Sequence, residues 1–196
     1  AAKEMGVKVS NASGYSTQSV AELALGMMLS LLRNVPQVEE RCRAGKTKDG
    51  LVGTELRGKT VGIVGAGAIG QNTGRLCKAF GCKVIAYNHR PKQAAEGTID
   101  EFVDLDTLTR ESDIISLNCP LNDSTRGMFD FGRIAMMKKT AILINVARGL
   151  VESAVRGVGV RQKITAFTQQ RGSGGVVRAH FKHIFGQGEI LSLLMI

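Results

Sequence analysis

Six residues near the middle of the chain have the spacing of a phosphate-binding loop. The segment Gly65-Ala66-Gly67-Ala68-Ile69-Gly70 reads GxGxxG and follows the β-branched run 60–64. In such a loop the first glycine permits a tight turn, the second lets the backbone approach a pyrophosphate, and the third allows a helix to pack closely on a strand. The N–H groups and the positive dipole end of the following helix attract phosphates. We therefore predict that a dinucleotide pyrophosphate is bound by Gly65, Gly67, Ala68, Ile69 and Gly70.

The residues after the next expected strand predict which dinucleotide is bound. An Asp or Glu at this place accepts a hydrogen bond from the ribose 2′-OH of NAD, whereas neutral or basic residues accommodate the 2′-phosphate of NADP. The segment 87–92 reads YNHRPK, so it brings no carboxylate and two cations. NADP is therefore slightly favoured over NAD at a site made by Asn88, His89, Arg90 and Lys92. The alternative is that the two cations face solvent and that Asn88 binds either cofactor.

A parallel sheet is needed to bring these loops together. Apolar runs rich in β-branched residues predict buried strands at 60–64, 83–87, 113–117 and 141–146. Helical patterns lie between them, from the glycine loop to Phe80 and from Leu105 to Arg110. Strands that alternate with helices predict βαβ units. The expected fold class is α/β, a Rossmann-type doubly wound parallel sheet with helices on both faces.

The residues before the glycine loop predict a short strand and two helical segments. Val7 to Ser10 reads as a strand followed by a Gly/Ser/Asn loop. Ser19 with Glu22 three residues later fits a capping box, so a helix is expected to begin near Ser19. Its apolar residues are too numerous for one stripe, which predicts cover on more than one side. Pro36 is expected to kink or restart the helix, and Gly45 to end it.

Composition restricts the class of protein. The 196 residues are 43% hydrophobic and 22% charged, as in ordinary globular proteins. No stretch is long enough to cross a bilayer and no secretory leader is recognised, so we expect a cytoplasmic protein. The four cysteines lack metal-ligand spacing, so we expect free, mostly buried thiols and no metal site. The net charge of +9 is spread without aromatic interleaving, which indicates a generally basic surface rather than a nucleic-acid site.

Residues from about 3 to 152 resemble the D-isomer-specific 2-hydroxyacid dehydrogenases, particularly their glycerate dehydrogenase/hydroxypyruvate reductase branch. The matching segments are NASGYSTQSVAE (11–22), ELRGKTVGIVGAGAIG (55–70), NCPLNDST (118–125) and MKKTAILINVARG (137–149). The resemblance implies hydride transfer between NAD(P)H and a small 2-oxoacid such as hydroxypyruvate, in a cleft between two domains. It also implies a homodimer formed through the cofactor domain.

The resemblance also assigns roles to residues that match the family's motifs. Arg148 matches the catalytic arginine, whose guanidinium holds the substrate carboxylate and polarises the carbonyl. Pro120, Thr125 and Ala147 match positions on the cofactor side of the cleft. On residue type alone, an arginine at a strand end is more often a salt-bridge partner.

The sequence departs from the family after about Glu152. The family's downstream Glu, in a strand like LDVFE, and its His general acid/base have no counterpart in the corresponding stretch, and His180 and His183 lack the Pro-His context. We interpret residues 1–18 as a remnant of the substrate domain, 19–152 as the dinucleotide-binding domain and 153–196 as a divergent tail. Our hypothesis is an altered reading frame in this tail, which predicts a sheet without its last strands and a weakly active or inactive chain.

Three functions remain open at this point. The first is an oxidoreductase acting on a small 2-hydroxyacid or 2-oxoacid. The second is a nucleotide-binding protein without turnover, since general acid catalysis alone contributes about 10²–10⁴-fold to such a reaction. The third is a corepressor-like binding protein, a role known within the family for which no residue here gives specific support.

Overall fold

The computed structural model describes residues 4–8, 10, 14–90, 96–147, 151, 163–171 and 177–184. Its helices are α1 (Thr17–Leu32), α2 (Val35–Arg43), α3 (Ala68–Ala79), α4 (Leu105–Glu111) and α5 (Phe131–Met136). Its strands are β1 (Thr60–Val64), β2 (Lys83–Tyr87), β3 (Glu101–Phe102), β4 (Ile114–Leu117), β5 (Ile142–Asn145), β6 (Lys163–Arg171) and β7 (Val177–Ile184). Strands and helices alternate from β1 to β5, which confirms the expected α/β class.

The described strands form one sheet in the order β3-β2-β1-β4-β5-β6-β7. All neighbours from β3 to β6 are parallel, and β7 runs antiparallel to β6. The chain moves outward from β1 through β2 to β3 and then returns to β4 on the other side of β1. This reversal is the topological switch point at which open α/β sheets bind ligands, outside the carboxyl ends of the strands.

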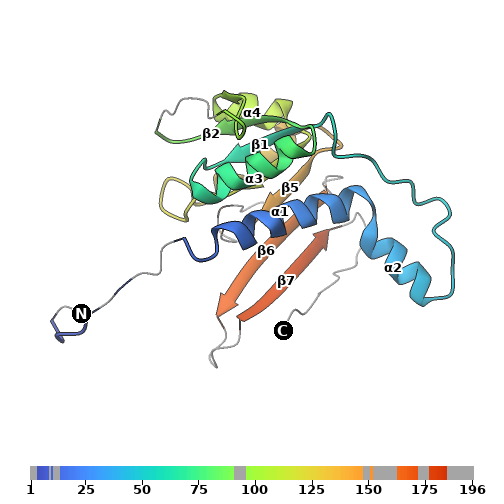
Figure 1. Ribbon diagram of the computed structural model, residues 1–196, viewed down its shortest axis with the longest axis horizontal. Coiled ribbons are helices and arrows are strands. Elements are labelled where there is room, and N and C mark those ends of the chain that lie inside the picture. Colours follow the sequence, from blue (N-terminus) through green and yellow to red (C-terminus); the bar gives the residue numbers. More distant parts are fainter. Residues whose placement is uncertain are drawn as a thin grey trace.

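Helices cover both faces of the sheet, as a doubly wound fold requires (Figure 1). On one face α1 and α3 run side by side, and Met28 and Cys77 are buried with Ile63 of β1. On the other face α4 and α5 contribute Leu108 and Ile134 to a second core. Successive residues of each strand point to opposite faces, so strands buried on both faces are apolar throughout. This is why four short β-branched runs predicted β1, β2, β4 and β5 to within one residue at either end.

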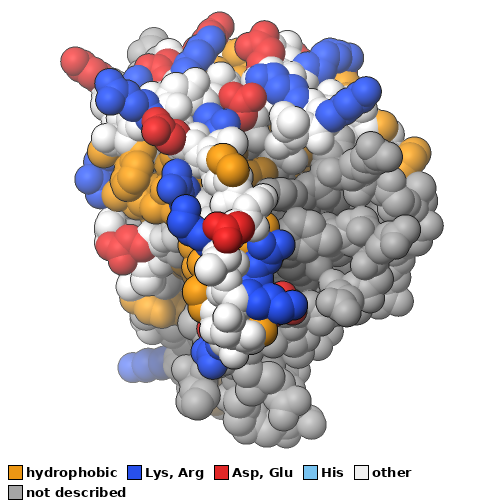
Figure 2. Space-filling view, turned by 90° about the vertical axis from the view of Figure 1, so that its right-hand side faces the viewer, with side chains coloured by type: hydrophobic (Ala, Val, Ile, Leu, Met, Phe, Trp, Pro, Cys, Tyr) orange, Lys and Arg blue, Asp and Glu red, His pale blue; other side chains and the backbone are white. Residues whose placement is uncertain are grey.

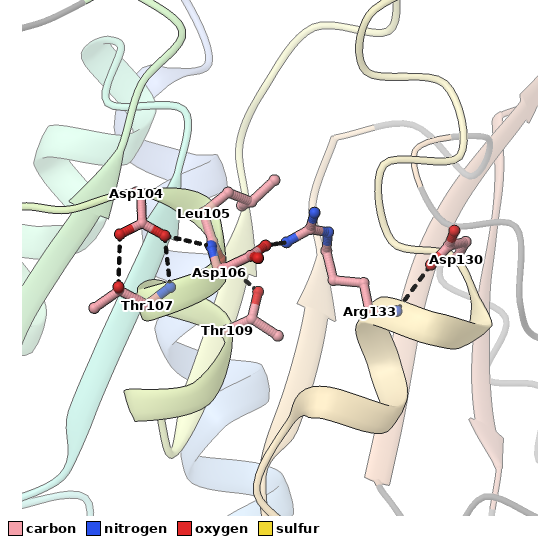
Figure 3. Close-up of polar contacts among 7 residues, drawn as sticks. All are labelled: Asp104, Leu105, Asp106, Thr107, Thr109, Asp130 and Arg133. Carbon is pink, nitrogen blue, oxygen red and sulfur yellow. Dashed lines mark hydrogen bonds and ion pairs between the residues drawn. The ribbon is translucent and has the colours of Figure 1, made fainter.

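The α4–α5 pair on the second face is held by polar contacts that Figure 3 shows. Asp104 caps α4, because its carboxylate accepts hydrogen bonds from the N–H groups of Asp106 and Thr107, both at 2.9 Å. Asp130 caps α5 by accepting from the N–H of Arg133 at 2.8 Å. The Arg133 guanidinium then reaches across to Asp106 at 2.7 Å and links the two helices. The caps explain how helices of seven and six residues begin at fixed places.

The first helix begins earlier than the capping box predicted. The structure places Ser16 at the N-cap of α1, after a turn in which the N–H of Thr17 donates to the carbonyl of Gly14. The Ser19 hydroxyl donates to the Ser16 carbonyl at 3.0 Å, and Glu22 accepts from Gln18 instead of capping. The prediction that the helix begins near Ser19 was therefore wrong, because the turn from Gly14 to Thr17 places Ser16 at the N-cap.

The segment before α1 also differs from its prediction. No strand forms at the described residues 7, 8 and 10, where a strand over Val7 to Ser10 was expected. A strand needs a neighbour to share its hydrogen bonds, and this segment runs away from the sheet (Figure 1). After α1 the expected restart at Pro36 is confirmed, since Pro36 lies in the first turn of α2. The helix ends at Arg43, followed by Gly45 at a φ of 66°.

The sheet does not stop at β5, which corrects the prediction that its last strands are missing. β6 pairs in parallel with β5 from Ile142↔Lys163 to Asn145↔Ala166, and β7 adds an antiparallel strand beyond it. The signal overlooked was the alternation of apolar and polar residues in VRAHFKHI, which is typical of a half-buried strand. His180 and His183 lie in this strand at paired positions opposite Thr168 and Thr165.

The surface around α2 carries charges of both signs. None of the α2 residues is buried, and Glu39 pairs with Arg43 one turn later at 2.8 Å. On the face shown in Figure 2, basic side chains are interspersed with acidic ones among the described residues. No helix within the described part of the chain is long and apolar enough to cross a membrane.

Candidate functional site

The glycine loop lies at the switch point and has the turn that its first glycine predicts. Gly65 follows β1 directly and has a φ of 95°, a conformation that side chains disfavour. The carboxyl ends of three strands meet here, because the N–H of Gly65 donates to Tyr87 of β2 and the N–H of Asn118 after β4 donates to Val64. A β-carbon on Gly65 would lie 2.8 Å from the backbone nitrogen of Cys119. Only glycine fits between these strand ends.

The other two glycines of the loop fit the remaining tasks of the motif. A β-carbon on Gly70 would lie 2.2 Å from the Gly65 carbonyl oxygen and 3.0 Å from Ile63, so glycine at 70 lets α3 pack against β1. Gly67 is exposed and a β-carbon there would meet nothing within 4 Å. The missing side chain at Gly67 thus leaves open space above the backbone, as a pyrophosphate needs for close approach.

The start of α3 supplies the electrostatics for an anion. Gly67 is the N-cap, no side chain caps the helix, and the first turn holds no acidic residue. The N–H groups of a first helical turn have no partner within the helix, and the dipole makes this end positive. Ala68 is exposed and Ile69 is half-buried at this end. The glycine loop 65–70 and the start of α3 therefore form a cradle, the glycine cradle, that fits the pyrophosphate of a dinucleotide, with backbone N–H groups as its donors.

The loop after β2 holds the residues expected to select the cofactor. Asn88 is half-buried, and its side-chain N–H donates to the carbonyl of Arg90 at 2.8 Å. This contact folds the loop back on itself immediately after Tyr87, which lies beside Gly65. His89 and Arg90 are exposed, as a residue that contacts a cofactor phosphate at the surface would be. Lys92 lies outside the described residues.

The loop after β4 is a compact turn in which Thr125 has a structural task. The Thr125 hydroxyl donates to the carbonyl of Pro120 at 2.6 Å and accepts from the N–H of Asn122 at 2.9 Å. Asn122, which the sequence reading overlooked, accepts from the N–H groups of Ser124 and Thr125 through its side chain. Pro120 is exposed while Thr125 is buried. Thr125 therefore shapes the loop, and Pro120 is an exposed residue of it that follows Cys119, the neighbour of Gly65.

The end of β5 shows a second asparagine that sequence reasoning missed. Asn145 is fully buried, and its side-chain oxygen accepts from the N–H of Ala147 at 2.9 Å. The bond fixes the backbone where the chain leaves the sheet, two residues after the strand ends. An Asn at the end of an apolar run was the available signal, because Asn favours such local bonds. Ala147 is half-buried at this carboxyl edge, and Arg148 lies outside the described residues.

The structure thus brings together four loops at one edge of the sheet. They follow β1, β2, β4 and β5, whose last residues are paired in register as Val64↔Tyr87, Val64↔Leu117 and Leu117↔Asn145. The described site residues are Gly65, Gly67, Ala68, Ile69, Gly70, Asn88, His89, Arg90, Pro120, Thr125 and Ala147. Among the described residues, no group of three His, Cys, Asp or Glu side chains is placed to hold a metal ion.

Comparison with known proteins identifies this arrangement. Residues 25–155 match the family model of the "D-isomer specific 2-hydroxyacid dehydrogenase, NAD binding domain". Hydroxypyruvate reductase of Thermotoga maritima is 47% identical over 149 residues, which cover 76% of this chain and 48% of that protein.

Solved structures give the same result. The apo-structure of D-lactate dehydrogenase from Escherichia coli is similar with a TM-score of 0.74 and 34% identity, over 84% of this chain and 55% of that one. An acyclic imino acid reductase in complex with NADPH and D-arginine is similar with a TM-score of 0.69 and 36% identity, over 78% of this chain and 49% of that one. This chain spans about half the length of the relatives it matches. The matched residues include all four loops of the site, and the chain belongs to the D-isomer-specific 2-hydroxyacid dehydrogenase family, whose NAD-binding domain it contains.

Proposed function

We propose that this chain is the cofactor-binding part of an NAD(P)H-dependent reductase of small 2-oxoacids. The single observation that carries the proposal is the glycine cradle at the switch point, where residue 65 has no room for a side chain and residue 67 faces open space. Such a cradle binds a dinucleotide so that its reactive ring extends along the carboxyl edge of the sheet. When bound, the cofactor supplies the hydride for reduction of the substrate carbonyl.

Hydroxypyruvate is our proposed substrate, with other small 2-oxoacids as the alternatives. The proposal is supported by the identity of 47% with a hydroxypyruvate reductase. Relatives named for lactate and for phosphoglycerate match with 43% identity each, so the similarity alone supports the class of substrate more strongly than its side chain.

Arg148 is the residue that we propose to bind the substrate carboxylate and to polarise the carbonyl. It follows Ala147, whose backbone is fixed by the buried Asn145 at the carboxyl edge. A guanidinium offers two parallel donors, which suits a carboxylate beside a carbonyl oxygen on which negative charge develops.

NADP is our proposed preference over NAD. Asn88 at the end of β2 brings no negative charge to repel a 2′-phosphate, and the exposed Arg90 offers a positive one. A similar structure, that of an acyclic imino acid reductase, contains NADPH. In that arrangement Lys92 would be a second cation for the phosphate.

A second candidate function is dinucleotide binding without turnover. The observation that favours it is the end of the family match at residue 155. The strands β6 and β7 come after this residue, so they lie outside the part of the chain that resembles the dehydrogenases. A chain of this kind would bind the cofactor at the glycine cradle and would not reduce a 2-oxoacid.

Parallel titrations of the full chain with NADH and NADPH test these proposals. A ligand that binds only the folded state raises the melting temperature in proportion to the logarithm of its concentration above the Kd. We expect both nucleotides to raise it, NADPH more strongly, and absence of any rise would refute the dinucleotide site. Addition of hydroxypyruvate to the NADPH-loaded chain then separates the two functions, because only a reductase consumes the reduced nicotinamide.

A further inference from the structure

Two cysteines lie in contact at the end of α3 that faces away from the glycine loop. The helix ends at Ala79, and Gly81 follows with a φ of 78°. The N–H of Gly81 donates to the carbonyl of Lys78 at 2.9 Å, and the N–H of Cys82 donates to the carbonyl of Cys77 at 3.1 Å. These two bonds are the Schellman motif, in which the residue after the glycine contacts the residue five positions before it. In this chain both members of that contact are cysteines.

The two side chains are enclosed in the core between α1, α3 and β2. Cys77 is 0% exposed and Cys82 is 4% exposed. The Cys77 sulfur lies 3.8 Å from the Met28 sulfur, and the Cys82 thiol donates to the carbonyl of Leu56 at 3.4 Å. Both cysteines belong to one buried hydrophobic cluster. Both cysteines are free in the structure.

The two thiols differ in acidity. A hydrogen bond from Cys77 lowers the pKa of the Cys82 thiol, burial opposes this, and the ammonium groups of Lys59 and Lys78 lower it further. The same hydrogen bond and burial raise the pKa of Cys77. Cys82 is therefore the more acidic of the two thiols, and its thiolate is the form that acts as nucleophile in thiol oxidation.

We propose that Cys77 and Cys82 are a redox-active pair that a hydroperoxide converts into an intrachain disulfide between the end of α3 and the start of β2. The backbone hydrogen bond of 3.1 Å between the two residues brings them close together, and a disulfide requires Cα atoms roughly 4.4–6.8 Å apart. The turn at Gly81 places both residues in the same buried cluster.

The chemistry takes place in two balanced steps. The Cys82 thiolate attacks one oxygen of hydrogen peroxide, the O–O bond breaks, and the products are Cys82 sulfenic acid and hydroxide, which is protonated to water. The Cys77 sulfur then attacks the sulfenic sulfur, the S–S bond forms, and the hydroxyl leaves as a second water with the Cys77 proton. Two sulfur atoms lose one electron each, and the peroxide gains both. A dithiol reverses the modification by thiol–disulfide exchange.

The other two cysteines serve as internal references for this reaction. Cys42 is exposed on α2, so it reports how strongly a peroxide treatment oxidises an accessible thiol. Cys119 is buried beside Gly65, where burial raises its pKa, so it reports on a buried thiol without a partner.

Peptide mapping of the full chain after treatment with hydrogen peroxide tests the proposal. Trypsin cleaves after Arg75, Lys78 and Lys83, which places the two cysteines in separate peptides, LCK (76–78) and AFGCK (79–83). We expect these peptides to appear joined, with two hydrogens lost, and to separate after treatment with a dithiol. In a Cys42→Ser chain, the number of thiols that can be alkylated after unfolding should fall from three to one.

Two results would overturn the proposal. One is recovery of both peptides in the alkylated form under conditions that fully oxidise Cys42 in the unmodified chain. The other is conversion of Cys82 to its sulfinic or sulfonic acid without any joined peptide. A Cys77→Ser chain should give the sulfenic acid at Cys82, which a cyclic diketone traps. The shift of melting temperature with NADH should survive oxidation, because the pair and the glycine cradle lie at opposite ends of α3.

Discussion

Gly65 and Cys119 approach each other so closely that a β-carbon on residue 65 would lie 2.8 Å from the Cys119 backbone nitrogen. The contact joins the loop after β1 to the loop after β4, which are separate in sequence and adjacent at the switch point. The shape of the nucleotide site therefore depends on both loops. Substitutions at Gly65 and Gly67 separate the folding of this site from its affinity for the nucleotide.

Replacing Gly65 with alanine should unfold the cradle and destabilise the chain. The residue has a φ of 95°, which costs a side chain about 1–2 kcal/mol, and the clash with Cys119 adds to this. We expect the free energy of unfolding to fall by about 2 kcal/mol or more, with loss of the thermal shift by NADH, as measured by urea unfolding and melting curves. Gly58→Ala is the matched control, since Gly58 has a φ of 76° and open space at its β-carbon. Equal effects of the two substitutions would argue against a specific contact at residue 65.

Gly67→Ala should spare the fold and weaken nucleotide binding. A β-carbon at residue 67 meets no protein atom within 4 Å, but it would occupy the space through which a pyrophosphate approaches the backbone. We expect an unchanged melting temperature without ligand and a Kd for NADH raised at least tenfold, about 1.4 kcal/mol, in a fluorescence titration. Gly26→Ala should leave the Kd unchanged, because that exposed glycine also faces open space but belongs to α1 and not to the loop. Unaltered affinity in the Gly67→Ala chain would contradict the pyrophosphate assignment.

Asn88→Asp should reverse the preference that we propose between the two cofactors. A carboxylate after β2 accepts from the ribose 2′-OH of NAD and repels the 2′-phosphate of NADP. The ratio of the Kd for NADPH to that for NADH should rise by roughly tenfold or more, which corresponds to about 1.4 kcal/mol. Parallel titrations measure the ratio, and Asn88→Ser serves as a neutral control. If the carboxylate left the ratio unchanged, the loop after β2 would not contact the adenosine ribose.

Asp113 should make stability depend on pH below about 4. Burial alone would raise the pKa of this carboxyl, but hydrogen bonds from the Lys138 ammonium at 2.8 Å and from the N–H of Thr60 at 2.9 Å outweigh it, so the pKa is lowered on folding. A lowered pKa means that the stabilisation is complete above the unfolded value of about 3.9 and is lost as the pH falls through the folded value. The sign is therefore a loss of stability in acid.

Asp113→Asn tests this dependence. At pH 7 the substitution should lower the free energy of unfolding by about 1 kcal/mol, a modest value because solvent screens a partly exposed pair. The difference from the unsubstituted chain should shrink as the pH falls below about 4, as urea unfolding at several pH values would show. Asp123→Asn in the exposed loop after β4 is the control, and a difference that persisted in acid would rule out the ionised carboxylate as its source.

The sequence predicted those parts of the fold that depend on local pattern. Runs such as TVGIV and AILINV are predominantly apolar, and strands covered on both faces need that composition, so β1 and β5 were predictable. The three glycines were predictable because each excludes a side chain for a stated reason. β3 could not be predicted, because it has two residues and forms by pairing with β2, and no local sequence pattern indicates that pairing. The start of α1 depended on a turn at Gly14, and the buried hydroxyl of Thr125 depended on how its loop closed.

The two C-terminal strands, β6 and β7, are connected to the rest of the sheet only by the pairing of β6 with β5 in the described chain. β6 pairs with β5 and β7 and touches no other strand of the described chain, while the nucleotide loops follow β1, β2, β4 and β5. The described strands after residue 155, β6 and β7, therefore join the sheet through β5 alone. Replacement of β6 and β7 during evolution would leave intact the pairings of β1, β2, β4 and β5 that position the nucleotide loops.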